Sequence, residues 1–104
     1  MLIYHYVHSL ERVSVFEYLR IEEDGFRLAA VRKLPVGSPP PPVTGMGDDR
    51  LPPGSAILLR ELRLLLTPAA AQSLSLGGFN LDLSGYDTGT PVVVRVVRIP
   101  RIWR

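Results

Sequence analysis

The chain has 104 residues, of which 46% are hydrophobic and 21% charged, and its formal net charge at pH 7 is +2. This length and balance exclude an intrinsically disordered chain and predict one small globular domain over residues 1–104. The chain contains no cysteine, which excludes a disulfide framework and thiolate metal sites.

No stretch of the sequence approaches the roughly 18–20 apolar residues needed to span a membrane. The N-terminus also lacks the basic and apolar regions of a secretory signal. We therefore expect a cytoplasmic protein that does not insert into a membrane.

The first strand is predicted over residues 2–7, where both faces of the alternation are apolar or aromatic. Such a strand is expected at the centre of a sheet, or covered on both sides. A turn should follow. A short helix capped by Ser9 is the alternative, but β-branched and aromatic residues favour strand.

Residues 12–34 predict a β-hairpin folded at Asp24-Gly25, because Asp-Gly supplies the positive φ values of a type I′ turn. In that register three apolar pairs share one face and two ion pairs are directly opposed. The apolar pairs are Ile21 with Leu28, Leu19 with Ala30, and Val15 with Leu34. The ion pairs are Glu22 with Arg27 and Glu17 with Arg32.

Residues 35–54 hold seven of the ten prolines and four of the nine glycines. This composition predicts a long Pro/Gly-rich loop, within which the four successive prolines of residues 39–42 favour the polyproline II conformation. We expect a stiff connector between two halves of the domain. A ligand for an aromatic-lined groove is the less favoured alternative.

Residues 56–66 fit either a buried strand or an amphipathic helix, and we favour the strand. The reason is that Thr67-Pro68 is itself a helix start, which predicts a short helix near 68–76 that ends at Gly77-Gly78. Strands are expected over 79–83 and 91–99, joined by a turn. The predicted fold class is therefore α+β, with a mostly antiparallel sheet of five to six strands.

Positive charge is concentrated at the C-terminus. Residues 1–94 carry eight basic and ten acidic side chains, whereas the last ten residues carry four arginines and no acid. Residues 100–104 form a basic tail in which Trp103 lies between two arginines, and tryptophan and arginine are favoured interface residues. The candidate binding residues are Arg95, Arg98, Arg101, Trp103 and Arg104, together with Tyr4, Tyr6 and Tyr18.

Three interpretations of this arginine run remain open. The tail can dock onto a protein partner or a second copy, it can bind single-stranded nucleic acid together with the tyrosines, or it can form a solvated fringe on an edge strand. We favour protein docking. The slightly acidic body of the chain argues against a dedicated nucleic-acid binder.

Signals for catalysis are weak. Asp87-Thr88-Gly89 matches the three-residue signature of aspartic proteases, but apolar residues do not precede it and a polar turn explains it better. His5 and His8 face opposite sides of a strand and have no evident third metal ligand. We expect a non-catalytic interaction protein with no cofactor and no metal. Binding of single-stranded nucleic acid is the alternative, and a proteolytic homodimer is a distant third.

Overall fold

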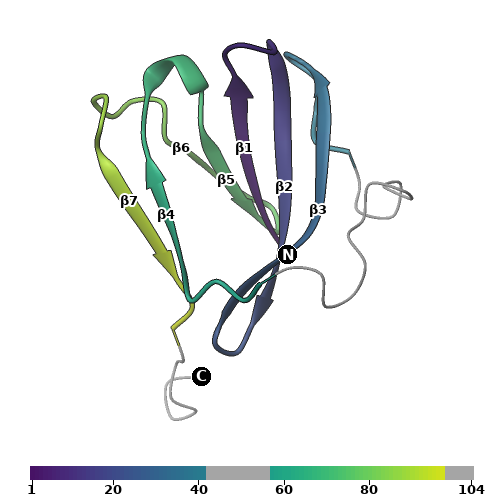
Figure 1. Cartoon of the computed structure of the whole chain (residues 1–104), viewed down its shortest axis with the longest axis vertical. Helices are drawn as coiled ribbons and strands as arrows, with labels where there is room; N and C mark the ends of the chain where they lie inside the picture. The colour runs from purple at the N-terminus through teal and green to yellow at the C-terminus, as the bar shows by residue number, and fades with distance from the viewer. Residues whose placement is uncertain (42–56, 98–104) are drawn as a thin grey trace.

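The computed structural model of the chain describes residues 1–41 and 57–97, which form seven β-strands and one short 3₁₀ turn (Figure 1). Every strand pair is antiparallel. Five strands form one sheet in the order β3-β2-β1-β5-β6, which we call the large sheet, and two form the small sheet. The strands are β1 (Leu2–His8), β2 (Val13–Glu22), β3 (Gly25–Pro35), β4 (Glu61–Leu65), β5 (Ser73–Leu76), β6 (Phe79–Asp82) and β7 (Pro91–Arg95).

The prediction of a mostly antiparallel, sheet-rich fold is confirmed, but the α+β class is not supported. The described residues contain almost no helix, and their strands divide into two sheets instead of forming one. Figure 1 shows β4 and β7 side by side at the left, apart from β1, β2 and β3 at the right. None of the described helices is long and apolar enough to cross a membrane.

The central position of β1, between β2 and β5, agrees with the apolar and aromatic character of both its faces. The following turn is not the alternative Ser9-capped helix. The Arg12 backbone N–H donates to the His8 carbonyl at 2.8 Å, and Arg12 has a positive φ of 55°. This four-residue connection returns the chain directly into β2.

The β2–β3 hairpin forms as predicted, but its turn and register are shifted. The turn residues are Glu23 and Asp24, and Gly25 is already in β3, paired with Glu22. A type I′ turn needs positive φ at both central residues. Here Gly25 has φ 156° and Asp24 does not have a positive φ, so that turn cannot form.

A β-bulge shifts the register again further along the hairpin. Tyr18 pairs with Ala30 whereas Leu19 pairs with Leu28, which leaves Ala29 as an extra residue in β3. As a result Leu28 and Ala30, predicted on one face, pack into clusters on opposite faces. Leu34 likewise packs with Ala30, so the predicted one-sided apolar set is wrong.

The two predicted ion pairs have different outcomes. Glu22 and Arg27 are not directly opposed, but they form an ion pair across the diagonal, with Nε to Oε2 at 3.0 Å. Glu17 is opposed by Val31 and not by Arg32, because the shifted turn moves the register by two residues and the bulge restores only one. The register of the hairpin therefore leaves Glu17 without its predicted partner.

The predicted helix near 68–76 is wrong. A single 3₁₀ turn, Pro68–Ala70, is followed at once by β5. Thr67 makes no side-chain capping hydrogen bond, and Ala71 has a left-handed conformation with φ 46°, which ends the turn. Thr67 and Pro68 do occupy the N-cap and the start of this turn, but the turn extends over three residues only.

The alternation of serine and leucine in β5 explains why a strand forms there. Leu74 enters the core, and β5 pairs with β1 on one side and β6 on the other. Gly77 and Gly78, expected to end a helix, form the turn between β5 and β6. The alternation of buried and more exposed residues, which is typical of a strand, thus decides the structure here in place of the helix-start signal at Thr67-Pro68.

The other predicted strands are confirmed with shorter bounds. The ambiguous segment 56–66 contains the strand β4, the segment 79–83 contains β6, and the segment 91–99 contains β7. Residues 42–56 and 98–104, which include most of the predicted loop and the basic tail, lie outside the described residues.

Two clusters of buried side chains lie on opposite faces of the large sheet. The inner cluster lies between the sheets and consists of Leu2, Leu19, Phe26, Leu62, Leu66, Leu74 and Leu83. The outer cluster consists of Phe16, Tyr18 and Ala30. Residues 36–41 pass over the outer cluster, where the Tyr18 hydroxyl donates to the Pro41 carbonyl at 2.6 Å. We call these two faces the inner and outer faces.

The two sheets are joined by a backbone contact. Phe26 and Leu59 exchange both hydrogen bonds, with Phe26 N–H to Leu59 O at 2.7 Å and Leu59 N–H to Phe26 O at 2.8 Å. A Cβ atom on Gly25 would overlap the Leu59 carbonyl and approach the Arg60 Cα within 3.0 Å. Glycine is therefore required at this position for close approach of the two backbones.

We predict that Gly25→Ala destabilises the fold by about 2 kcal/mol or more, because the new Cβ forces the segment that contains Leu59 away from β3. Urea unfolding measures this free energy. Gly85→Ala is the matched control, because a Cβ there meets nothing within 4 Å, and it should change stability by less than about 0.5 kcal/mol. Equal effects of the two substitutions would contradict the close approach.

Candidate functional site

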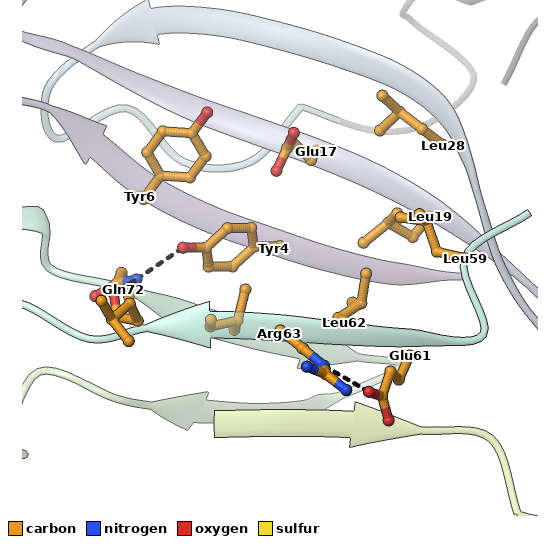
Figure 2. Close-up of a pocket in the computed structure, with 12 residues that line it drawn as sticks. Tyr4, Tyr6, Glu17, Leu19, Leu28, Leu59, Glu61, Leu62, Arg63 and Gln72 are labelled. Carbon is orange, nitrogen blue, oxygen red and sulfur yellow. Dashed lines mark hydrogen bonds and ion pairs between the residues drawn. The ribbon is translucent and has the colours of Figure 1, made fainter. Parts of the chain in front are cut away.

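A pocket of about 580 Å³ lies between the inner face of the large sheet and β4 (Figure 2). This volume is within the range of small-molecule and peptide side-chain sites. Leucines from β2, β3, β4 and the segment before β4 form its apolar walls. Its polar lining consists of Tyr4, Tyr6, Glu17, Glu61, Arg63 and Gln72.

The pocket exists because the two sheets differ in width. A five-stranded sheet faces a two-stranded one, so the small sheet cannot cover the whole inner face. Leu62 is buried against the large sheet, whereas Tyr4, Tyr6 and Glu17 are left half-buried beside it. Apolar surface on the inner face is therefore open next to the edge of β4.

The hydrogen bonds around β4 establish which backbone groups face this opening. Leu66 directs both its N–H and its C=O toward the start of β7, bonding Thr90 and Gly89. The backbone groups of successive residues in a strand point to opposite edges. The backbone N–H and C=O of Leu65 therefore point away from β7, and its carbonyl accepts from Gln72 Nε2 at 3.3 Å. The backbone groups of Leu59 point to the same edge as those of Leu65, and they bond Phe26 of β3.

Glu61 and Arg63 lie between these two anchored residues and share their direction. They pair with Arg95 and Val93 in the ladder without exchanging hydrogen bonds there, since the bonded pairs alternate. Among the described residues, no backbone hydrogen bond outside the strand ladders involves either of them. Two N–H and two C=O groups on the edge of β4 therefore face the pocket without a backbone partner within residues 1–41 and 57–97.

Gln72 closes one end of the pocket. Its side chain is 4% exposed, and its Nε2 donates to the Tyr4 hydroxyl at 2.8 Å. Its Oε1 accepts from the Thr67 backbone N–H at 2.9 Å. Together with the bond to the Leu65 carbonyl, these contacts fix β1, the end of β4 and the 3₁₀ turn relative to one another.

Glu17 lies on the inner face directly across from Tyr4 in the β1–β2 ladder (Figure 2). None of the hydrogen bonds or ion pairs within residues 1–41 and 57–97 involves its carboxylate. Burial raises the pKa of Glu17 above its ordinary value. A half-buried carboxylate without a partner is costly for folding, and such groups are more common at functional sites than elsewhere.

The rings of Tyr4 and Tyr6 lie side by side, with centroids 5.1 Å apart and planes tilted by 34°. Burial raises the pKa of both hydroxyls, and the charge of Glu17 raises it further. The hydrogen bond from Gln72 partly offsets the effect on Tyr4. Both tyrosines are therefore neutral at physiological pH and flank the carboxylate with aromatic surface.

The predicted binding residues do not all lie in one place. Tyr4 and Tyr6 lie together in the pocket, but Tyr18 is fully buried on the outer face and cannot extend their stacking surface. Arg95 forms an ion pair with Glu61, with Nε to Oε2 at 2.7 Å. The remaining predicted residues, Arg98, Arg101, Trp103 and Arg104, lie outside the described residues.

Sequence reasoning did not identify Glu17, Gln72 or the edge of β4 as parts of a site. A signal existed for Glu17, which alternates with Val15 and Leu19 as the single acid on an apolar face. No local signal marks Gln72. The exposed edge depends on sheet order, which local patterns do not determine.

The other residues considered for chemistry do not assemble into a site. Within the described part of the chain, no three metal-ligating side chains lie together. His5 stacks on Phe16 at 4.7 Å on the outer face, and burial lowers its pKa. Asp87 lies in the connection from β6 to β7, where its carbonyl accepts from the Thr90 N–H and hydroxyl.

No protein-family model, curated protein or solved structure matches this chain.

We predict that Glu17→Gln raises the free energy of unfolding at pH 7, by less than about 1 kcal/mol because solvent screens a half-buried carboxylate. A raised pKa means that the contribution of Glu17 is most favourable below its ordinary pKa of 4.5 and is lost as pH rises through the folded value. The gain of the variant over the parent should therefore vanish near pH 3.5. Urea unfolding at both pH values tests this.

Glu11→Gln is the matched control. Hydrogen bonding and the charge of Lys33 lower the pKa of Glu11, so this substitution should decrease stability at pH 7. A loss of stability in Glu17→Gln would show that Glu17 has a stabilising partner. A gain that is the same at both pH values would show that the charge of Glu17 is not its cause.

Proposed function

We propose that this chain is a non-catalytic interaction protein that binds an extended segment of a protein partner, or of a second copy, at a sheet edge. The observation that carries the proposal is the unpaired edge of β4 at Glu61 and Arg63, open above an apolar pocket. Extended peptides commonly bind by adding a strand to such an edge, with neighbouring pockets selecting side chains.

Other exposed apolar surface supports an interaction function. Phe79 and Leu81 of the edge strand β6 are 67% and 42% exposed, and Leu65 of β4 is 70% exposed. Unprotected edges with apolar side chains favour pairing with another chain. The proposed partner is therefore either a second copy or an unrelated protein.

The Arg/Trp tail belongs to the same proposal on sequence grounds. Arg95 is engaged by Glu61, and Arg63 bonds the same carboxylate at 2.6 Å. The hydrogen bonds from these arginines lower the pKa of Glu61. We propose that the arginines and Trp103 beyond β7 add further contacts to a bound partner.

Binding of single-stranded nucleic acid remains the alternative proposal, with less support. Tyr4 and Tyr6 offer a stacking pair, but Glu17 beside them would repel phosphates, and Tyr18 is buried on the other face. A stacking platform for nucleic acid usually combines aromatic rings with positive charge.

The test removes one backbone donor from the edge of β4. Arg63→Pro deletes the N–H that faces the pocket and leaves the bonds of β4 to β7, because those involve the alternate residues. Arg63→Ala is the control, since it removes the side chain but keeps the N–H. Peptides selected by the parent protein from a displayed library of random heptapeptides should bind Arg63→Ala normally and Arg63→Pro at least about fivefold more weakly.

Self-association measured by analytical ultracentrifugation should respond in the same way, if a second copy is the partner. The proposal fails if no heptapeptide is enriched and the parent is monomeric. It also fails if Arg63→Pro, shown by urea unfolding to be folded, binds as Arg63→Ala does.

A further inference from the structure

We propose that the pocket selects a basic side chain: an extended peptide pairs with β4 at Glu61 and Arg63 and inserts a lysine or arginine that contacts the Glu17 carboxylate between Tyr4 and Tyr6. This inference rests on the proposed function and specifies the chemistry of its ligand. The occupant is a peptide strand whose inward side chains alternate as apolar, basic and apolar.

The geometry of strand addition places such a side chain over the pocket. A strand added to β4 would extend the small sheet over the uncovered part of the inner face, in the same layer as β4. Alternate side chains of the added strand would then point toward the large sheet, roughly 7 Å apart. Leu19 and Leu28, which pair across β2 and β3 on one side of Glu17, offer apolar contacts to one of the flanking inward residues.

Charge complementarity identifies the central inward residue. Glu17 lines the pocket and has no ion pair within the described part of the chain. Arg63, a cation that lines the pocket, bonds another acid. Arg63 and Arg95 bond Glu61, and Lys33 bonds Glu11 at 3.1 Å. A ligand cation would supply the missing partner in a partly desolvated site, where such bonds are strong.

The aromatic rings favour the same ligand. Tyr4 is directly opposite Glu17 in the ladder, and Tyr6 is its diagonal neighbour. Ammonium and guanidinium groups are attracted to the faces of tyrosine rings, and the attraction strengthens on desolvation. An acidic side chain would instead meet the carboxylate, and an apolar one would leave it buried without a partner.

The test uses blocked five-residue peptides, Val-Thr-Xaa-Thr-Val, with lysine, norleucine or glutamate at the central position. Dissociation constants are measured by NMR titration of the full chain. We expect the lysine peptide to bind about tenfold more tightly than the norleucine peptide, which has a side chain of similar length without the charge. The glutamate peptide should bind most weakly.

Glu17→Gln should remove the preference for lysine over norleucine without weakening the binding of the norleucine peptide, because an amide costs less than a carboxylate to bury beside an apolar side chain. Tyr6→Leu should reduce the preference, and Tyr6→Phe should retain most of it. Because Glu17→Gln is expected to be at least as stable as the parent, a folding defect cannot explain its loss of preference.

Equal affinities for the lysine and norleucine peptides, or a lysine preference that persists in Glu17→Gln, would overturn the inference. If the norleucine peptide binds and Arg63→Pro weakens it, strand addition at β4 stands and the cation site alone is wrong. If none of the peptides binds, the heptapeptide library yields no ligand and the parent is monomeric, both proposals fail.

Discussion

The arrangement of the two sheets depends on one close backbone contact, the reciprocal hydrogen bonds between Phe26 and Leu59. The contact is possible because Gly25 has no Cβ, so the chain before β4 can lie directly against the start of β3. Gln72 provides the second attachment, at the other end of β4, through Leu65 and Tyr4. Between these two attachments β4 is separated from the large sheet, and that separation is the pocket.

The same arrangement explains why the site combines an apolar surface with unsatisfied polar groups. A two-stranded sheet fills the inner cluster with Leu62 and Leu66 but leaves part of the inner face uncovered. Glu17 and the backbone of Glu61 and Arg63 remain without partners among the described residues. A half-buried carboxylate without a partner opposes folding, whereas a bound strand with a cationic side chain would pair both this carboxylate and the edge of β4. The charge that is unfavourable for the isolated fold is thus one that favours a ligand.

Local sequence patterns predicted where the strands lie better than they predicted which strands and residues pair. Alternation located β1 and the hairpin, and the helix near 68–76 failed because capping signals at Thr67 and Pro68 are local whereas the burial of Leu74 is not. The shifted register could not be predicted, because it depends on Leu59, which lies far from Gly25 in the sequence. That register error also hid the site, since it paired Glu17 with Arg32. Tyr4 and Tyr6 were the predicted site residues that the structure brings together, because alternation alone places them on one face.

The claim that one edge of β4 is unpaired can be tested directly by amide hydrogen exchange along this strand. In the unliganded protein we expect slow exchange at Leu62 and Leu64, whose amides bond β7, and exchange at least about a hundredfold faster at Glu61 and Arg63. This alternation should disappear when a peptide binds at the edge. Uniformly slow exchange from Glu61 to Leu64 in the free protein would show that both edges are already paired, and would contradict the account.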